Sequence, residues 1–100
     1  MSYEIIPSKE FLNQLKSINP KYRRIIETKI NLIKENPYRY KRIHSKNYSR
    51  VFRVRFSIEN KETRLIYIIL EPSIILVCLL DRKRDYNDLE KHLEKLRKEI

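Results

Sequence analysis

Hydrophobic and polar residues alternate along the segment from Arg50 to Ile58. The apolar positions are Phe52, Val54, Phe56 and Ile58, and between them stand Arg53, Arg55 and Ser57. A two-residue period is typical of a strand that buries one face and exposes the other. We therefore expect a half-buried strand whose exposed face carries arginine.

Two further segments, 64–70 and 74–80, are apolar at nearly every position. Runs of this length without alternation predict central strands that are buried on both faces. The charged segment 59–62 and the sequence Glu71-Pro72-Ser73 separate the strands, which predicts an antiparallel meander. Residues 3–6 form another short strand candidate, closed by Pro7.

Two helices are predicted between the first strand and the basic region. Ser8 is a candidate N-cap, and the apolar residues that follow it at helical spacing are Phe11, Leu12, Leu15 and Ile18. Asn19-Pro20 predicts a second helix start. The apolar face of that helix consists of Tyr22, Ile26, Ile30 and Ile33. Because only a few residues join the two helices, we expect an antiparallel helical hairpin.

A third helix is predicted after Asp85, which can cap it, and its apolar stripe consists of Leu89, Leu93, Leu96 and Ile100. This stripe is expected to be buried, against the domain's own sheet or against a partner. The segment from Tyr38 to Tyr48 has no clear period and is expected to be a loop. The predicted order is β-α-α-β-β-β-α over residues 1–100, a single α+β domain. The N-terminal helical hairpin and the C-terminal helix pack on a small, mainly antiparallel sheet.

Charge is unevenly distributed along the chain. The 23 lysines and arginines outnumber the 13 acidic residues, which gives a formal net charge of +10. Between Pro37 and Ile58 there is no acidic residue, and the basic residues are Arg39, Lys41, Arg42, Lys46, Arg50, Arg53 and Arg55. Such segregated charge favours nucleic acid as the partner. No apolar stretch approaches the roughly 20 residues that a membrane helix needs, so no membrane is expected.

Composition also excludes several chemistries. Glycine is absent, so glycine-rich phosphate and dinucleotide loops are excluded. Cys78 lies in an apolar run and is expected to be a buried hydrophobic residue. One cysteine with His44 and His92 cannot form a recognisable zinc site, so neither a metal nor another cofactor is expected. No secretory signal pattern is present, and the expected location is the cytoplasm.

Arginines from three successive strand segments are the candidate functional residues. Arg53 and Arg55 share a strand face, Arg64 opens the next strand, and Arg82 follows the third. A charge inside a strand is costly unless it faces water or an anionic partner, and the planar guanidinium suits phosphate. The alternative is an edge strand whose charge prevents aggregation. The recurrence of arginine on neighbouring strands favours a phosphate site.

Tyr86 is the candidate for proton transfer, because cationic neighbours stabilise a phenolate. The alternative is that Tyr86 packs as the first member of the Leu89 stripe. The segment 38–42 alternates aromatic and basic residues, which can stack on bases and bind phosphates, or can form a plain basic surface loop. The candidate RNA-binding residues are Arg39, Lys41, Arg42, Lys46, Arg50, Lys83 and Arg84.

The predicted element order and three short motifs resemble the RelE/ParE toxin superfamily over nearly the whole chain. The motifs are Phe52-Arg53-Val54-Arg55-Phe56, Thr63-Arg64-Leu65-Ile66-Tyr67 and Asp81-Arg82-Lys83-Arg84-Asp85-Tyr86. The resemblance implies a small cytoplasmic toxin that cuts mRNA on the ribosome and is paired with a cognate antitoxin protein. The implied reaction is metal-independent attack of a ribose 2′-oxygen on the adjacent phosphate, which inhibits translation.

The resemblance also assigns roles to individual residues. Arg53 and Arg55 match the paired basic residues that orient and polarise the 2′-hydroxyl and the phosphate. Arg64 matches the arginine that stabilises the phosphorane. Arg82 matches the basic residue near the leaving 5′-oxygen, and Tyr86 matches the terminal tyrosine that often acts as base.

Two observations leave other functions open. The family usually has glycines in the turn between the second and third strands and before the C-terminal motif, and this chain has none. The superfamily also contains gyrase-targeting toxins that lack the nuclease residues. A non-nucleolytic toxin of this fold and a plain basic nucleic-acid-binding module therefore remain alternatives to the mRNA endoribonuclease.

Overall fold

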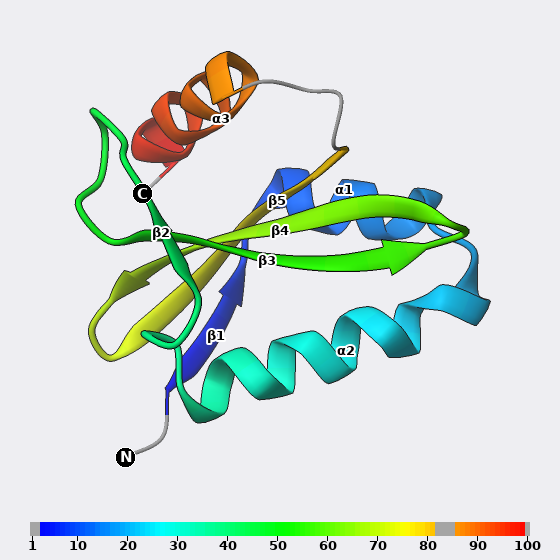
Figure 1. Ribbon diagram of the computed structural model, residues 1–100. Coiled ribbons are helices and arrows are strands. Elements are labelled where there is room, and N and C mark those ends of the chain that lie inside the picture. Colours follow the sequence, from blue (N-terminus) through cyan, green and yellow to red (C-terminus); the bar gives the residue numbers. More distant parts are fainter. Residues whose placement is uncertain (1–2, 82–85, 100) are drawn as a thin grey trace.

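The computed structural model describes residues 3–81 and 86–99. Within them, five strands form one mixed sheet and three helices pack against it (Figure 1). The elements in chain order are β1 (Glu4–Pro7), α1 (Lys9–Ser17), α2 (Pro20–Glu35), β2 (Lys41–Ile43), β3 (Val51–Ile58), β4 (Lys61–Leu70), β5 (Ser73–Asp81) and α3 (Tyr86–Glu99). The sheet order is β1-β5-β4-β3-β2, with β1 parallel to β5 and every other pair antiparallel. The predicted α+β fold and the meander of β3, β4 and β5 are confirmed.

The strand β2 was not predicted. The expectation that the whole segment from Tyr38 to Tyr48 is a loop is wrong for Lys41–Ile43. These residues pair with Val51–Arg53 at the edge of the sheet. Three residues are too few to show a two-residue period, so the strand depends on its neighbour for its formation.

The N-terminal helical hairpin forms as predicted. The Ser8 side chain accepts a hydrogen bond from the Phe11 amide at the start of α1, and Asn19 caps α2 ahead of Pro20. These contacts satisfy amide groups that a helix end leaves without intrahelical partners. Phe11 is buried, whereas Leu12, which was expected on the same apolar face, is 45% exposed.

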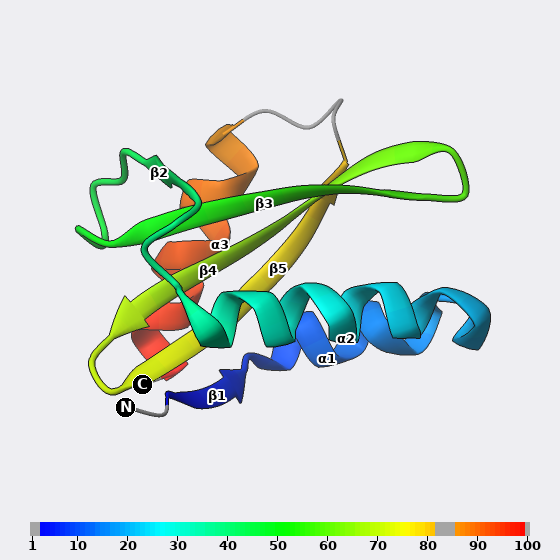
Figure 2. The same ribbon diagram turned by 60° about the horizontal axis from the view of Figure 1, so that its bottom comes forward.

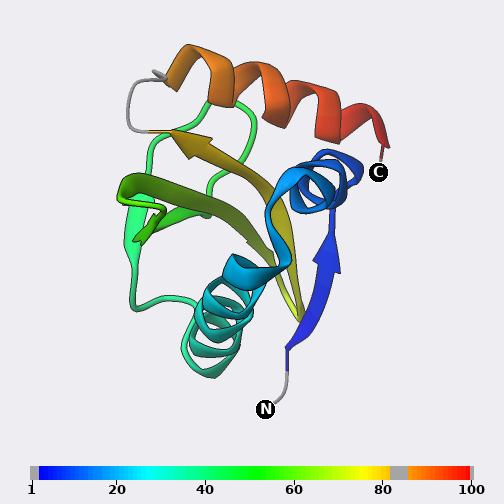
Figure 3. The same cartoon turned by 90° about the vertical axis from the view of Figure 1, so that its right-hand side faces the viewer.

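The helices cover the two faces of the sheet unequally. Figure 2 shows α1 and α2 together on one face, and Figure 3 shows α3 on the opposite face. The first face buries a core that joins the helical hairpin to β3, β4 and β5; its members include Phe11, Ile26, Ile33, Phe52, Val54 and Tyr67. On the second face, α3 contributes Leu89, Leu93 and Leu96 to a separate core. The leucine stripe therefore packs on the chain's own sheet.

The β3–β4 hairpin turns without glycine. Ile58 pairs with Lys61, which leaves Glu59 and Asn60 as the two turn residues. Their φ angles are 53° and 63°, the left-handed values that a type I′ turn requires at both positions. Asparagine tolerates this region well, but a glutamate there carries backbone strain.

The free half of β5 is bonded to side chains of the α1 region. Pairing with β1 ends at Leu76, and beyond it the Ser8 hydroxyl donates to the Val77 carbonyl at 2.7 Å. The Gln14 amide then bonds Leu79 in both directions, with Nε2 donating to the carbonyl at 2.9 Å and Oε1 accepting from the amide at 2.6 Å. Backbone groups that would otherwise be left unpaired at this edge are thereby satisfied.

Within residues 3–81 and 86–99, none of the helices is long and apolar enough to cross a bilayer.

Candidate functional site

One face of β2, β3 and β4 gathers four basic side chains. Strand alternation puts Arg53 and Arg55 on the α3 side of the sheet, opposite the face occupied by Phe52 and Val54. Arg55 is paired directly with Arg64 of β4, and Arg53 with Lys41 of β2. Directly opposed residues of antiparallel strands share a face, with Cβ atoms about 4.5–5.5 Å apart. We call Lys41, Arg53, Arg55 and Arg64 the cationic face.

The members of the cationic face differ in burial. Arg53 is only 7% exposed, Arg64 is half-buried, and Lys41 and Arg55 are exposed. The Nε atom of Arg64 is buried, and it has no hydrogen-bond partner among the residues described. A buried guanidinium N–H without a partner costs free energy that a bound oxyanion would recover.

Glu62 brings one carboxylate to this face. Its position two residues before Arg64 puts both side chains on the same side of β4. Its Oε1 atom lies 3.6 Å from the Nε of Arg55, and the side chains of Arg55 and Glu62 are 53% and 30% exposed. An ion pair with this much solvent contact contributes little to stability, so Arg55 can exchange Glu62 for a phosphate at small cost.

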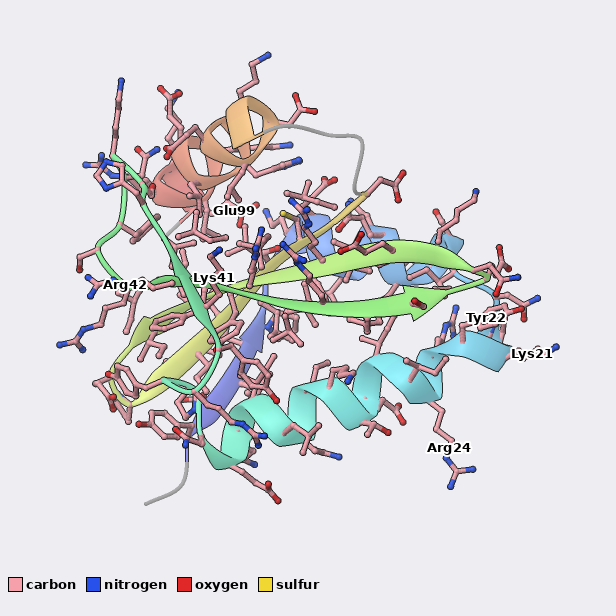
Figure 4. The ribbon with its side chains drawn as sticks, viewed as in Figure 1. Lys21, Tyr22, Arg24, Lys41, Arg42 and Glu99 are labelled. Carbon is pink, nitrogen blue, oxygen red and sulfur yellow. The ribbon has the colours of Figure 1, made fainter. Side chains whose placement is uncertain are left out.

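The other described basic residues of the predicted RNA surface lie on or near the β2 edge of the sheet. Arg39 packs over the ring of Tyr40, with its guanidinium 6.0 Å from the ring centroid. Arg42 donates from Nε and Nη2 to the Ser49 carbonyl and so closes the β2–β3 loop (44–50). Lys46 is exposed in that loop. Figure 4 shows Arg42 at the outer side of β2, with Lys41 beside the sheet.

Arg50, directly before the first residue of β3, contacts a cluster of tyrosines. Its Nη1 donates to the Tyr38 hydroxyl at 3.2 Å, and its guanidinium lies 5.9 Å from the Tyr38 ring centroid. The Tyr38 hydroxyl donates to Glu71 at 2.7 Å, as does Tyr3 at 3.1 Å. The hydrogen bond to Glu71 raises the pKa of Tyr38 above its ordinary value. Tyr38 is therefore held as a neutral phenol and offers its ring as a stacking surface.

Several predicted site residues are outside the part of the chain that the structure describes. Arg82, Lys83 and Arg84 lie between β5 and α3, in the segment that is not described, as does the predicted cap Asp85. Tyr86 is the first residue of α3, but its side chain is also outside the description. The positions predicted to surround the leaving group and to transfer protons therefore stay predictions.

The histidines and Cys78 take no part in the cationic face. His44 is exposed in the β2–β3 loop, and His92 is half-buried on α3. Cys78 is fully buried in the core beneath α3, as predicted. Among residues 3–81 and 86–99, no three His, Cys, Asp or Glu side chains lie close enough together to hold a metal ion.

The chemistry available to the cationic face follows from its residue types. Guanidinium groups bind phosphate oxygens in a planar, bidentate manner and stabilise charge that develops on them. They remain protonated and so cannot exchange a proton with the substrate. The described part of the face can hold and polarise a phosphodiester, and Glu62 is the carboxylate that the structure adds to it.

Sequence reasoning missed three polar side chains. Glu62 had a usable signal, because its even spacing from Arg64 predicts the same strand face. Gln14 and Glu90 had none, since their contacts join residues 65 and about 44 positions apart. No local pattern indicates such long-range pairs.

Comparison with known proteins gives both a family and a fold. A family model described as the ParE toxin of the type II toxin–antitoxin system parDE matches residues 5–86. A search of curated proteins finds no similar sequence.

Solved structures of an E. coli toxin share this fold. A double mutant of E. coli RelE in the free state has a TM-score of 0.71 at 13% identity, covering 96% of this chain and 99% of that one. The isolated E. coli RelE toxin has a TM-score of 0.64, also at 13% identity, covering 99% and 100%. At this level of identity the likeness concerns the fold alone.

Proposed function

The chain belongs to the ParE toxin family of type II toxin–antitoxin systems, within the RelE/ParE superfamily, and on that premise we propose that it is an mRNA endoribonuclease acting on the ribosome. Such a toxin is paired with a cognate antitoxin protein. The proposed reaction is metal-independent attack of a ribose 2′-oxygen on the adjacent phosphate. Its outcome is the arrest of translation.

The cationic face carries this proposal. Three arginines from two adjacent strands share one side of the sheet, and Arg64 keeps a buried Nε without a described partner. A folded protein tolerates such costly placement where it serves a function, and a phosphodiester supplies the missing acceptors. An apolar substrate or a cationic one would leave these groups uncompensated.

The proposed roles follow the geometry of an in-line displacement. Arg53 and Arg55 would orient the scissile phosphate and lower the pKa of the 2′-hydroxyl. Arg64, which is half-buried and lies opposite Arg55, would stabilise the additional negative charge of the phosphorane. Arg82 would stabilise the leaving 5′-oxygen, and Tyr86 would act as the base. These last two roles rest on the resemblance, because neither side chain is described.

The basic edge of the molecule would bind the rest of the RNA and the ribosome. Arg39, Lys41, Arg42, Lys46 and Arg50 lie on or beside β2 and the β2–β3 loop, and Lys83 and Arg84 follow β5 in sequence. A net charge of +10 suits a ribosome, whose surface is rich in phosphate. Tyr38 and Tyr40 could add base stacking to these phosphate contacts.

The test is cleavage of mRNA on translating ribosomes. We expect the wild type to cut, Arg64→Ala to lose most of that activity, and Tyr86→Phe to lose it if the phenol is the base. Arg24→Ala is a matched control, because Arg24 projects from α2 away from the body of the protein (Figure 4). Intact mRNA with the wild-type protein on active ribosomes would refute the proposal. Binding without cutting would indicate a plain nucleic-acid-binding module.

A gyrase-directed toxin is the second candidate. The observation that favours it is the family model itself, which describes a ParE toxin. This function does not need a phosphodiester-cleaving face, so Arg64→Ala should leave it intact. A DNA supercoiling assay with purified gyrase distinguishes the two: inhibition of supercoiling together with intact mRNA supports the gyrase-directed function.

A further inference from the structure

The carboxylate of Glu90 on α3 is the main hydrogen-bond acceptor for the β2–β3 loop. Glu90 accepts hydrogen bonds from the Lys46 amide at 3.2 Å and the Ser45 hydroxyl at 3.3 Å, and from the Asn47 side-chain amide at 2.7 Å. Three donors from three successive loop residues therefore converge on one side chain. A carboxylate has enough lone pairs to accept all three.

The loop is shaped to present these donors. The Ser45 hydroxyl, which donates to Glu90, also accepts from the Asn47 amide at 3.0 Å and from the Tyr48 amide at 3.4 Å. This local turn points the Lys46 amide and the Asn47 side chain toward the helix. The loop conformation and its attachment to α3 are thus one hydrogen-bond network.

A second attachment lies two helical turns further along α3. Arg97 donates to the Asn47 side-chain oxygen at 3.5 Å, and Tyr48 and Ile43 pack against the core that contains Leu93. Glu90 and Arg97 are seven residues apart and so lie on the same flank of the helix. Figures 1 and 3 show the loop reaching α3 from the β2 side of the sheet.

The position of Glu90 links this network to the proposed reaction. Tyr86, the proposed base, is the first residue of α3 and stands four residues before Glu90 in the sequence. The loop itself continues from β2, which carries Lys41, into β3, which carries Arg53. Glu90 therefore connects the start of α3 with the strands that form the cationic face.

We propose that Glu90 is a positioning residue, which ties the β2–β3 loop to α3 and holds the start of α3 in one placement beside the cationic face. The inference rests on the proposed function for its effect on cleavage. The structural prediction of the inference is that the β2–β3 loop and the start of α3 open together, and it can be tested independently of the reaction. Reacting groups misplaced by about 1 Å can lose on the order of a hundredfold in rate, so a loosened helix start should slow cleavage.

The experiment combines amide hydrogen exchange with ribosome-dependent cleavage in Glu90→Ala, Glu90→Gln and Glu94→Ala. Glu94 is exposed one turn further along the same helix and serves as the matched control. We expect Glu90→Ala to speed exchange about tenfold at the amides of Lys46, Asn47 and Tyr48 and in the first turns of α3. Glu90→Gln, which keeps an accepting oxygen, should show a smaller increase, and Glu94→Ala no more than about twofold.

In the cleavage assay, Glu90→Ala should lower kcat about tenfold and leave KM within about twofold, because the residue acts through position. Equal exchange in Glu90→Ala and wild type overturns the inference, and so does faster loop exchange with an unchanged kcat or an unchanged α3. If the wild type does not cut mRNA, the proposed function fails, and the exchange at the loop and α3 still decides the role of Glu90. Thermal unfolding of both the Ala and the Gln variant shows whether loss of folding explains the effect of either one.

Discussion

The two faces of β3 and β4 are built from alternate residues of the same strands, yet they carry different kinds of side chain. The face beneath α1 and α2 is apolar and fully covered, with Phe52 stacked on Tyr67 at a centroid distance of 5.5 Å. The other face is apolar only where α3 lies over it, and it carries Arg53, Arg55 and Arg64 elsewhere. The first face is therefore occupied by core side chains throughout, whereas the second combines another core with the residues of the proposed site.

The largest expected effect is on stability, from the covered face. Phe52→Ala should lower the free energy of unfolding by about 3–5 kcal/mol, because it removes a buried ring and leaves a cavity. Phe52 is 5% exposed and contacts both Tyr67 and Tyr38. Urea denaturation measures the loss. A change below about 1 kcal/mol would show that this face does not dominate stability.

The next effect is on activity, from the cationic face. Arg64→Ala should slow mRNA cleavage by about 100–1,000-fold, equivalent to about 2.7–4 kcal/mol of transition-state stabilisation. The free energy of unfolding should stay within about 1 kcal/mol of wild type, because removing Arg64 also relieves repulsion from Arg55. Single-turnover cleavage and denaturation of the same preparation give both numbers. A variant that cuts normally, or one that unfolds, contradicts the division between the faces.

A smaller effect appears at alkaline pH. Burial raises the pKa of Tyr67 well above its ordinary value, and its hydroxyl donates to the Pro37 carbonyl. The unfolded chain ionises this phenol at about pH 10, whereas the folded chain does not, so the stability it contributes is complete below that pH and is lost as pH rises further. Tyr67→Phe should cost about 1 kcal/mol at neutral pH and flatten the decline above pH 10. Denaturation curves from pH 7 to 11 test this, and an unchanged slope would rule it out.

The smallest effect concerns Glu62. Glu62→Gln should raise RNA affinity about two- to fivefold at low salt, because it removes the carboxylate that competes for Arg55. Its effect on unfolding should be within about 0.5 kcal/mol. Glu27→Gln, which removes the same charge from an exposed position on α2, is the control. Equal affinity gains in the two variants would point to net charge rather than to the cationic face.

Local patterns predicted much of this fold. The alternation through Phe52 and Arg53 gave the correct strand and the correct face for its arginines, and Ser8 and Asn19 cap helices as expected. These features depend on neighbours within a few residues, so the sequence displays them directly.

The features that were missed depend on distant partners. The strand Lys41–Ile43 is defined by its pairing with β3, and the loop that follows it is fixed by Glu90 of α3. The register of Arg55 opposite Arg64 was also not predictable from either strand alone, although arginines on neighbouring strands indicated a shared face. Local spacing identifies the candidate residues, and only the folded chain shows which of them meet.

The bonds from Ser8 and Gln14 to β5 have a consequence for strand alignment. Residues 74–80 are apolar throughout, so a slip of this strand by one or two positions would still bury hydrophobic side chains on both faces. Hydrophobicity therefore specifies that β5 is a central strand, but it does not specify the register of β5 against the neighbouring strands. Gln14 pairs in both directions with the backbone of Leu79, and a slip by one position would turn the N–H and C=O groups at that place toward the other edge of the strand. The polar side chain of Gln14 on α1 thus helps to fix the register of β5, which the apolar side chains of the strand do not fix by themselves.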